Sequence, residues 1–358
     1  MRWRRLVIVS VAIAAVLLAG LYLFRAPLSL VVAGRVVEKR MAFDVMSALP
    51  DGLHVGLCGT GSPFPDEERS GPCTLVVAGK RLFLFDAGTG SARVISRMGF
   101  NTGRIEAIFL THFHSDHIDG LGEVLLQRWV SASNSRPVSV HGPSGVGDIV
   151  AGFMQAYQQD RAYRVAHHGE AIVPPGGWGA TAIAFNTAPS GRVVVLKEGD
   201  LEIAAFNVDH GPVQPAVGYR ISYKGRVVVL SGDTRKSPAV AREAANADLL
   251  VHEALSEPLL KILQTAAGGA GRENLRQVLV DIVNYHASPE DAAETARDAR
   301  VRYLMLSHIV PPLPLPGMKE AFLGKAASQY DGPIRIGADG DFVSLPSGSA
   351  EIGVSRRF

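Results

Sequence analysis

The chain has 358 residues, of which 47% are hydrophobic, and its formal net charge at pH 7 is +2. This length accommodates one large domain or two average ones, and the apolar fraction is enough for a sizeable core. The near-neutral charge balance gives no sign of the clustered basic face that is typical of nucleic-acid binding.

An apolar stretch near the start of the chain, residues 6–24, has no charged side chain and follows three arginines. As a helix, its 19 residues span about 28 Å, close to the roughly 30 Å of a hydrocarbon core. We expect residues 1–25 to be a membrane anchor, and a cleaved signal segment is the alternative, although residues 19–21 (Ala-Gly-Leu) are a poor cleavage site. Because a basic flank stays in the cytoplasm, the rest of the chain is expected outside it, in a bacterial periplasm.

The two cysteines, Cys58 and Cys73, flank a segment rich in turn residues. If the flanking strands pair, a disulfide between them is geometrically feasible, and an extracytoplasmic compartment would permit it. Two separate buried thiols are the alternative.

Residues 26–52 carry apolar side chains at roughly helical spacing up to a Pro-Asp-Gly turn, and we expect a helical connector there. Residues 53–358 are expected to form the globular domain. Strands are expected at 54–58, 74–77, 81–86, 105–110 and 137–143, and helices at 91–98, 121–130 and 146–164. Residues 169–200 have the weakest periodicity and receive no assignment. Strands alternate with helices from residue 105 onward, which predicts an α/β layered domain.

The most informative stretch is residues 111–117, which places three imidazoles and one carboxylate within six consecutive positions. His112 and His114 stand two apart, so an extended backbone points both side chains the same way. Asp116 and His117 are adjacent, and they cannot easily share one ion with both earlier histidines. Imidazole nitrogen and carboxylate oxygen suit zinc and related ions, so the spacing predicts two ions side by side. A polar loop that happens to be rich in histidine is the plain alternative.

The second half of the chain repeats one pattern, in which an apolar run ends at a side chain that can bind a metal. The residues at these ends are His210, Asp233, His252 and His308. Ligand sites of α/β sheets collect at strand ends, because loops there vary on a rigid scaffold. Four such residues after the opening motif predict a shared site.

With these residues in view, the sequence resembles the metallo-β-lactamase superfamily, and within it the branch of zinc-dependent arylsulfatases and tRNA 3′-processing endonucleases (tRNase Z). The resemblance runs from about residue 53 to residue 312, and it implies an αββα sandwich of two mixed sheets with helices outside. The segments that carry it are Gly59-Thr60-Gly61-Ser62-Pro63, Phe85-Asp86-Ala87-Gly88, the His112-x-His114-x-Asp116-His117 motif, Asp209-His210-Gly211, Gly218-Tyr219-Arg220-Ile221, Ser231-Gly232-Asp233-Thr234, His252-Glu253-Ala254 and Leu306-Ser307-His308.

The resemblance implies two Zn²⁺ ions held by seven side chains. These are His112, His114 and His210 on one ion, Asp116, His117 and His308 on the other, and Asp233 bridging both. A carboxylate can span two metals roughly 3.5–4 Å apart, and water held between such ions supplies a hydroxide nucleophile. Mn²⁺ or Fe²⁺ would suit the same ligands.

Catalytic roles are expected for Asp116 and for His252, the second as the general acid that protonates the leaving oxygen. A structural loop histidine is the alternative for His252. Asp86 resembles a residue that orients a ligand, and a strand-end cap is its alternative. His286 is expected to be structural or a weak site candidate.

Two departures from the RNases of this branch guide the expected function. Their long arm stands between the segments matching residues 218–221 and 231–234, where this chain has a short hairpin, and their Ser-x-Arg-Tyr stretch is replaced by an apolar one after His308. With an outward-facing anchor, these features favour a membrane-tethered dinuclear zinc hydrolase of a small ester, arylsulfatase- or phosphodiesterase-like, and argue against a nucleic-acid partner. A tRNase Z-like ribonuclease, a lactonase and a non-catalytic metal-binding protein are the alternatives.

Overall fold

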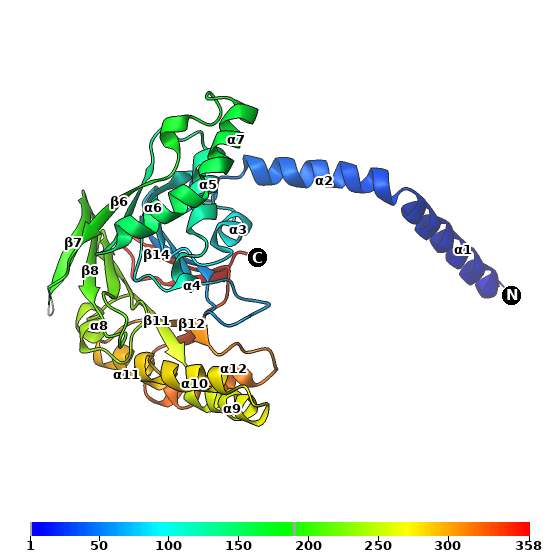
Figure 1. Cartoon of the computed structure of the whole chain (residues 1–358). Helices are drawn as coiled ribbons and strands as arrows, with labels where there is room; N and C mark the ends of the chain where they lie inside the picture. The colour runs from blue at the N-terminus through cyan, green and yellow to red at the C-terminus, as the bar shows by residue number, and fades with distance from the viewer. Residues whose placement is uncertain (1, 189–190) are drawn as a thin grey trace. The chain divides into compact units, whose positions relative to one another are not determined.

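The computed structural model describes residues 2–188 and 191–358 (Figure 1). The chain divides into two compact units, Met1–Ala48 and Leu49–Phe358. The first unit is helical, with α1 at Arg2–Leu23 and α2 at Arg25–Ala42. No described side chain of α1 is buried, and by length and composition this helix could cross a membrane. A signal sequence has the same length and composition, so the anchor stays a prediction.

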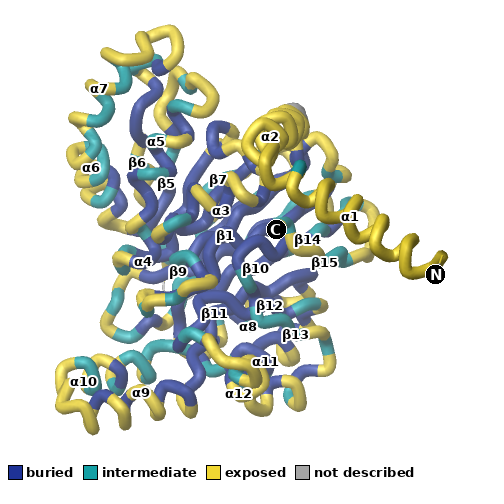
Figure 2. Tube along the Cα trace, turned by 90° about the vertical axis from the view of Figure 1, so that its right-hand side faces the viewer, coloured by how far each residue is buried: buried dark blue, intermediate teal, exposed yellow. Residues whose placement is uncertain are grey.

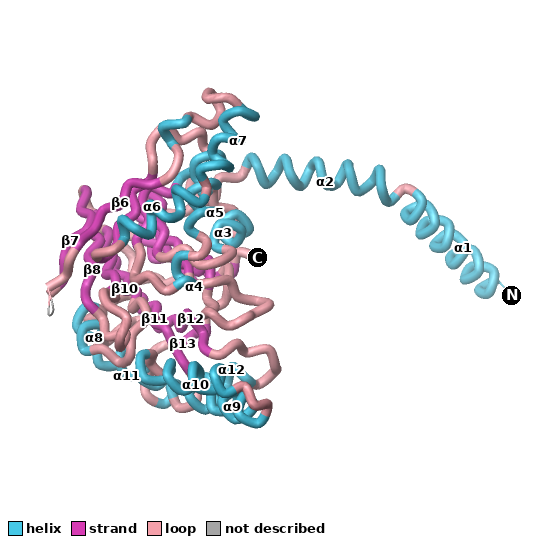
Figure 3. The backbone as a smooth tube through the Cα atoms, viewed as in Figure 1, coloured by secondary structure: helices cyan, strands magenta, loops and turns pink. Residues whose placement is uncertain are grey.

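The second unit contains two β-sheets, drawn in magenta in Figure 3. Within the described residues, the strand order of the first sheet is β15 (Gly353–Arg356), β14 (Asp341–Pro346), β1 (Gly52–Gly59), β2 (Cys73–Ala78), β3 (Arg81–Phe85), β4 (Ile105–Phe109), β5 (Val138–Pro143) and β6 (Ala180–Phe185). The order of the second sheet is β13 (Ile334–Ile336), β12 (Leu304–Val310), β11 (Leu249–Leu255), β10 (Arg226–Leu230), β9 (Val217–Tyr223), β8 (Leu201–Asn207) and β7 (Arg192–Glu198). Pairing is parallel from β3 to β6 and from β10 to β13 and antiparallel elsewhere, so both sheets are mixed.

Helices cover the outer face of each sheet. Those that follow strands of the first sheet are α3 (Ser91–Arg97), α4 (Ser115–Ile118), α5 (Leu121–Ser131), α6 (Val146–Ala156) and α7 (Gln158–His168). Those that follow strands of the second are α8 (Pro238–Glu243), α9 (Glu257–Gly269), α10 (Glu273–Asp281), α11 (Pro289–Asp298) and α12 (Met318–Leu323). One buried cluster joins Val240 of α8, Ala293 of α11 and Phe322 of α12 to Val229 and Leu304 of the second sheet. The helix–sheet–sheet–helix layering confirms the expected αββα sandwich.

The main core lies between the two sheets, and the inner strands that form it, such as β1 and β11, are dark blue in Figure 2. Phe85 stacks on Phe109 with ring centroids 4.9 Å apart, and Tyr219 from the other sheet meets Phe85 edge-on at 5.1 Å. The buried Tyr219 hydroxyl donates a hydrogen bond to the backbone oxygen of Leu110 (2.6 Å). This contact ties the second sheet to the end of β4, where residues 111–117 begin.

Most expected strands and helices form where the pattern placed them, with one correction. The expectation of a single helix over residues 146–164 is wrong, because the chain forms α6 and α7, which break at Tyr157 (φ −94°, ψ 6°). The break lets the Tyr157 ring stack 6.1 Å from Trp178, which in turn packs on Trp129. A helical pattern does not record such a long-range contact.

The unassigned residues 169–200 contain β6 and β7, one at the edge of each sheet. Most residues of these two strands are only partly buried or exposed, so their sequences lack the strong apolar alternation of strands inside a sheet.

Cys58 and Cys73 form a disulfide, which is one of the two arrangements that the sequence left open. The bond joins β1 to β2 at the base of the loop 59–72. Asp339 secures the same loop, because its carboxylate accepts hydrogen bonds from the Thr60 amide (3.0 Å), the Thr60 hydroxyl (2.9 Å) and the Ser70 amide (2.8 Å). Both ends of the loop are therefore fixed to the sandwich.

Candidate metal centre and active site

The segment after β4 presents the first four candidate ligands. His112 and His114 lie in the loop that follows the strand, and Asp116 and His117 lie on the short helix α4. His114 has an extended backbone (φ −59°, ψ 146°) directly before the helix, so the chain turns between the two pairs of ligands. The turn brings all four side chains to the same edge of the sandwich.

The second sheet presents the remaining three candidates. His210 follows β8, Asp233 follows β10, and His308 lies within β12. These three strands run in the same direction, so their carboxyl ends lie at one edge of the sheet. His308 has a φ of +49°, a conformation that non-glycine residues rarely adopt, and it is the extra residue where the pairing of β11 and β12 shifts register.

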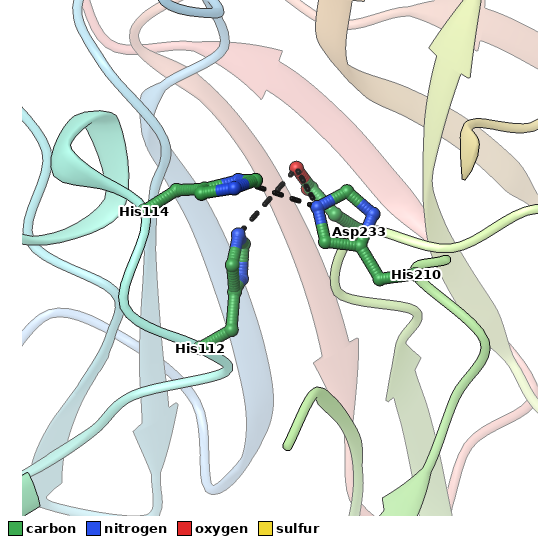
Figure 4. A group of neighbouring side chains, drawn as sticks. All are labelled: His112, His114, His210 and Asp233. Atoms are coloured by element: carbon green, nitrogen blue, oxygen red, sulfur yellow. Dashed lines mark hydrogen bonds and ion pairs between the residues drawn. The ribbon is translucent and has the colours of Figure 1, made fainter. Parts of the chain in front are cut away.

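Four imidazoles converge on one oxygen, Oδ2 of Asp233, and Figure 4 shows this carboxylate with His112, His114 and His210. The Nε2 atoms of His117 and His308 lie 3.2 Å from it, and those of His112 and His210 lie 3.9 Å from it. The structure therefore brings together ligands that are separated by up to 196 positions (112 to 308) in the sequence. A carboxylate surrounded in this way is placed to face two cations at once.

The ligand atoms fall into two groups, and within each group every atom lies within 4.8 Å of the others. One group is His112, His114, His210 and Asp233, and the other is Asp116, His117 and His308. His308 Nε2 lies 3.2 Å from Asp116 Oδ2, and His114 Nδ1 lies 3.3 Å from His210 Nε2. This grouping is compatible with a dinuclear metal site.

Buried atoms without partners support the same conclusion. Nε2 of His112 and Nε2 of His117 are buried and have no hydrogen-bond partner in the described part of the chain. A buried polar atom normally has a partner, since leaving it unpaired costs about 1–3 kcal/mol. A metal ion at the centre of each group would satisfy these nitrogens, so the residues present fit a pair of cations.

Contacts to the far ring nitrogens hold the imidazoles in place. His117 Nδ1 lies 2.8 Å from Asp86 Oδ2, and His210 Nδ1 lies 3.0 Å from the backbone oxygen of Tyr285. Asp86 also accepts hydrogen bonds from the Thr111 amide and hydroxyl, both at 2.8 Å. A partner on Nδ1 leaves Nε2 free to coordinate, as in other metal-binding histidines.

The protonation of the ligands follows from burial and from the central carboxylates. Burial lowers the pKa of His112 well below its usual value, so this imidazole is neutral and ready to coordinate. Burial acts the same way on His308, but Asp233 and Asp116 outweigh it and raise the pKa of His308 to about 9. Burial would raise the pKa of Asp233, yet the charges of His308 and His117 hold it well below its usual value. Metal binding must therefore displace protons from part of the cluster.

A pocket of about 320 Å³ opens onto this cluster. His114, Asp116, Asp233 and His308 form its polar end, and the other walls are mainly apolar. Those walls come from the loop 59–72, from α10, from the turn that follows it, and from β12, and their residues are Pro63, Phe64, Pro65, Leu275, Val278, Ile282, Tyr285 and Val310. The pattern of strands and helices did not identify these wall residues, because they come together only through the tertiary fold.

Two histidines outside the ligand set differ in their access to the pocket. His252, the expected general acid, is fully buried in β11, with Nδ1 2.7 Å from the backbone oxygen of Glu253, and it does not line the pocket. His286 does line the pocket, and its Nδ1 lies 3.0 Å from Glu253 Oε1. One ring nitrogen of His286 lies within 4.8 Å of the ligand atoms of Asp233 and His308. Of these two histidines, His286 is therefore the one that a bound substrate can reach.

The signal for His286 in the sequence was its position before a helix. Ser288 caps α11, accepting a hydrogen bond from the Asp291 amide (3.0 Å) while its own amide donates to the Asp291 carboxylate (3.1 Å). This capping box fixes the segment that carries His286.

Comparisons with known proteins identify the family to which the chain belongs. The model of the beta-lactamase superfamily domain matches residues 81–309. A protein named Ribonuclease Z from Mycolicibacterium gilvum (strain PYR-GCK) is 39% identical over 289 residues, covering 80% of this chain and 94% of the relative. A second Ribonuclease Z, from Mycobacterium bovis (strain BCG / Pasteur 1173P2), is 34% identical over 299 residues, with 80% and 96% covered.

Solved structures agree on the fold. The metallo-beta-lactamase fold protein YhfI from Bacillus subtilis has a TM-score of 0.57 at 19% identity, covering 82% of this chain and 99% of that protein. Human tRNase Z, short form, has a TM-score of 0.57 at 21% identity with the same coverage. At these sequence identities, the structural similarity supports the fold alone.

The named relatives correct two expectations drawn from the sequence. The expected small-ester substrate and the argument against a nucleic-acid partner are both contradicted, because proteins named Ribonuclease Z match across 94–96% of their own length. The short hairpin at Tyr223–Arg226 was taken as a sign against RNA. Relatives that align over nearly their whole length leave little room for a long inserted arm, so the hairpin does not separate this chain from them.

Proposed function

The chain belongs to the metallo-β-lactamase superfamily, and from that premise we propose that it is a two-metal phosphodiesterase of the ribonuclease Z type, acting on RNA. The observation that carries the proposal is the clustering of seven candidate ligands, with four imidazoles within 3.9 Å of Asp233 Oδ2, in a chain whose named relatives are ribonucleases. A metal-dependent hydrolase of phosphodiester bonds needs this arrangement, because charge develops on several phosphoryl oxygens at once.

For the metals we assign His112, His114 and His210 to one ion, Asp116, His117 and His308 to the other, and Asp233 to both. This assignment of ligands to the two ions follows the two groups of ligand atoms. The mixture of imidazole and carboxylate suits zinc, and Mn²⁺ or Fe²⁺ use similar ligands. When bound, the ions supply Lewis acidity toward phosphoryl oxygens.

We assign the proton donor to His286 in place of His252. Glu253 Oε1 accepts from His286 Nδ1 and from the amides of Thr234 (3.0 Å) and Ala287 (3.1 Å). The carboxylate therefore fixes the ring, and the other ring nitrogen of His286 is free to give a proton to the leaving sugar oxygen. His252 lacks access to the pocket and serves the packing of β11.

The walls of the pocket suit a nucleotide. Phe64 and Tyr285 offer aromatic faces beside the metal ligands, and unstacked bases of single-stranded RNA pack on such faces. Phe64 itself packs on the buried cluster of Leu260 and Leu279 from α9 and α10, so this wall is firmly supported.

The anchor and its orientation form part of the same proposal. We place α1 in a membrane and Leu49–Phe358 outside the cytoplasm, supported by the three arginines at its start and by the Cys58–Cys73 disulfide. Protease added to spheroplasts that express the chain should digest the catalytic unit. Resistance of that unit to the added protease would place it in the cytoplasm instead.

Cleavage of RNA by the purified full chain tests the proposal. The zinc-loaded protein should cut a precursor tRNA or a single-stranded oligoribonucleotide, a chelator should stop the reaction, and added zinc should restore it. His114→Ala provides the control, since it removes one ligand. Zinc-dependent hydrolysis of simple esters without any cleavage of RNA would contradict the proposal.

A further inference from the structure

A small cavity of about 50 Å³ lies between the metal centre and the main core. Asp233 and His308 line both this cavity and the 320 Å³ pocket. Phe85, Leu230 and Val251, which belong to the main core, form part of its other walls. One water molecule needs about 10–15 Å³ of such space, so the cavity is large enough for water.

Two buried polar atoms of residues that line this cavity have no hydrogen-bond partner in the part of the chain that the structure describes. They are Nδ1 of His308 and Oε2 of Glu253. The two residues belong to neighbouring strands, because Glu253 of β11 pairs with Ser307 of β12, and His308 is the next residue. Native proteins normally give such atoms a partner, since an unpaired buried donor or carboxylate oxygen is costly.

The far ring nitrogens of other candidate ligands already have partners. Nδ1 of His112 lies 3.0 Å from the Thr111 hydroxyl. Nδ1 of His117 and Nδ1 of His210 each lie within 3.0 Å of an oxygen. A histidine that binds a metal almost always donates its other ring N–H to a carboxylate, a carbonyl or a water. His308 therefore needs an acceptor at Nδ1 when its Nε2 coordinates an ion.

The chemistry of the two unpaired atoms specifies what can join them. Nδ1 of a coordinating His308 carries a proton and donates, whereas Oε2 of Glu253 accepts. A group between them must accept one hydrogen bond and donate another, which water can do and a cation cannot. We infer that the cavity holds a structural water that accepts from His308 Nδ1 and donates to Glu253 Oε2. This inference rests on the metal ligands assigned in the proposed function, and it does not depend on RNA as the substrate.

The bridging water gives Glu253 a second role. Oε1 of Glu253 accepts from Nδ1 of His286 (3.0 Å), and Oε2 reaches Nδ1 of His308 through the water. The rings of His286 and His308 are stacked, with centroids 5.4 Å apart and an interplanar angle of 22°. One carboxylate is thus a positioning residue for two neighbouring imidazoles, the proposed proton donor and a metal ligand.

A crystal structure of the zinc-loaded full chain, at a resolution that shows ordered water, tests the site directly. One water oxygen should lie within about 3.2 Å of both His308 Nδ1 and Glu253 Oε2. A cavity without ordered water, or a water bonded to neither or only one of these atoms, overturns the inference.

Two substitutions of Ser307, which lines the cavity, test what the water does for the metal. Ser307→Val replaces the hydroxyl with two methyl groups that fill the space, and Ser307→Ala leaves room for the water. In competition with a chromophoric chelator, Ser307→Val should bind one of its two zinc equivalents about tenfold more weakly, whereas Ser307→Ala should stay within about threefold of the wild type. Ser355→Val, on the exposed part of β15, is the control and should keep the wild-type affinity.

Wild-type zinc affinity in Ser307→Val, or an equal loss in Ser307→Ala, overturns the positioning role of the water. Thermal unfolding of the metal-free variants separates a loss of fold from a loss of affinity, and the wild-type crystal structure keeps the test open if Ser307→Val does not fold. Neither measurement involves RNA. A chain that holds the bridging water but cleaves no RNA therefore retains this site and loses the proposed function.

Discussion

Replacement of His286 by Gln isolates the proposed proton donor. The side chain lines the pocket, and Glu253 holds its Nδ1 at 3.0 Å while also binding two backbone amides, so the carboxylate stays in place after the substitution. General acid catalysis typically contributes a factor of 10²–10⁴. We expect kcat on RNA to fall by about 10²–10³, or roughly 3–4 kcal/mol in the barrier.

The leaving group provides the decisive comparison. A sugar oxygen leaves as a strong base and needs a proton, whereas p-nitrophenolate leaves without one, so His286→Gln should change the hydrolysis of bis(p-nitrophenyl) phosphate by less than about threefold. Zinc content, measured alongside, should remain at the wild-type value. His167→Gln, on the exposed end of α7, serves as the control. Equal losses on both substrates would refute the role of His286 as the proton donor and point to a structural one.

Three further outcomes follow from the contacts of the centre. Asp86→Asn weakens the hold on His117 Nδ1, so zinc affinity measured by competition with a chromophoric chelator should fall about 10–100-fold, and an unchanged affinity would remove Asp86 from the site. In the metal-free chain, the pKa of His308 is raised from 6.5 to about 9 by Asp233 and Asp116 against the effect of burial, so its stabilisation is fully present below pH 6.5 and is lost as pH rises through 9. Urea unfolding should show a decrease on the order of 3 kcal/mol between these pH values, and stability that increases over this range would contradict the assignment. Reduction of Cys58–Cys73, which closes a separation of 15 residues, should lower the unfolding free energy by about 3 kcal/mol, and a Cys58→Ser/Cys73→Ser chain that unfolds at the wild-type urea concentration would show that the disulfide is dispensable.

The parts of the site that the sequence could predict are those with a local signal. His112 and His114 could be predicted from their spacing, and Asp233 and His308 from the apolar runs that precede them in the sequence. Strand direction brings such residues to one edge whatever the loops do, which is why seven side chains far apart in the chain meet.

The parts that could not be predicted depend on tertiary contacts. His252 ends an apolar run and His286 precedes a helix, but neither local feature tells which of them faces the pocket, because only the fold decides it. Phe64 lies in a loop without periodicity, and its place in the pocket wall follows from the disulfide and from Asp339, a residue 275 positions beyond it. The edge strands β6 and β7 were missed for a similar reason, since partial exposure weakens the apolar alternation of a strand.

Titration of zinc into the metal-free full chain, with cleavage of a labelled RNA followed at each step, tests the central claim most directly. Activity should rise to its maximum as two equivalents of zinc bind, and Asp233→Asn should abolish it, because one carboxylate oxygen faces both groups of ligands. Full activity at one equivalent, or RNA cleavage that survives the loss of Asp233, would contradict a two-metal ribonuclease.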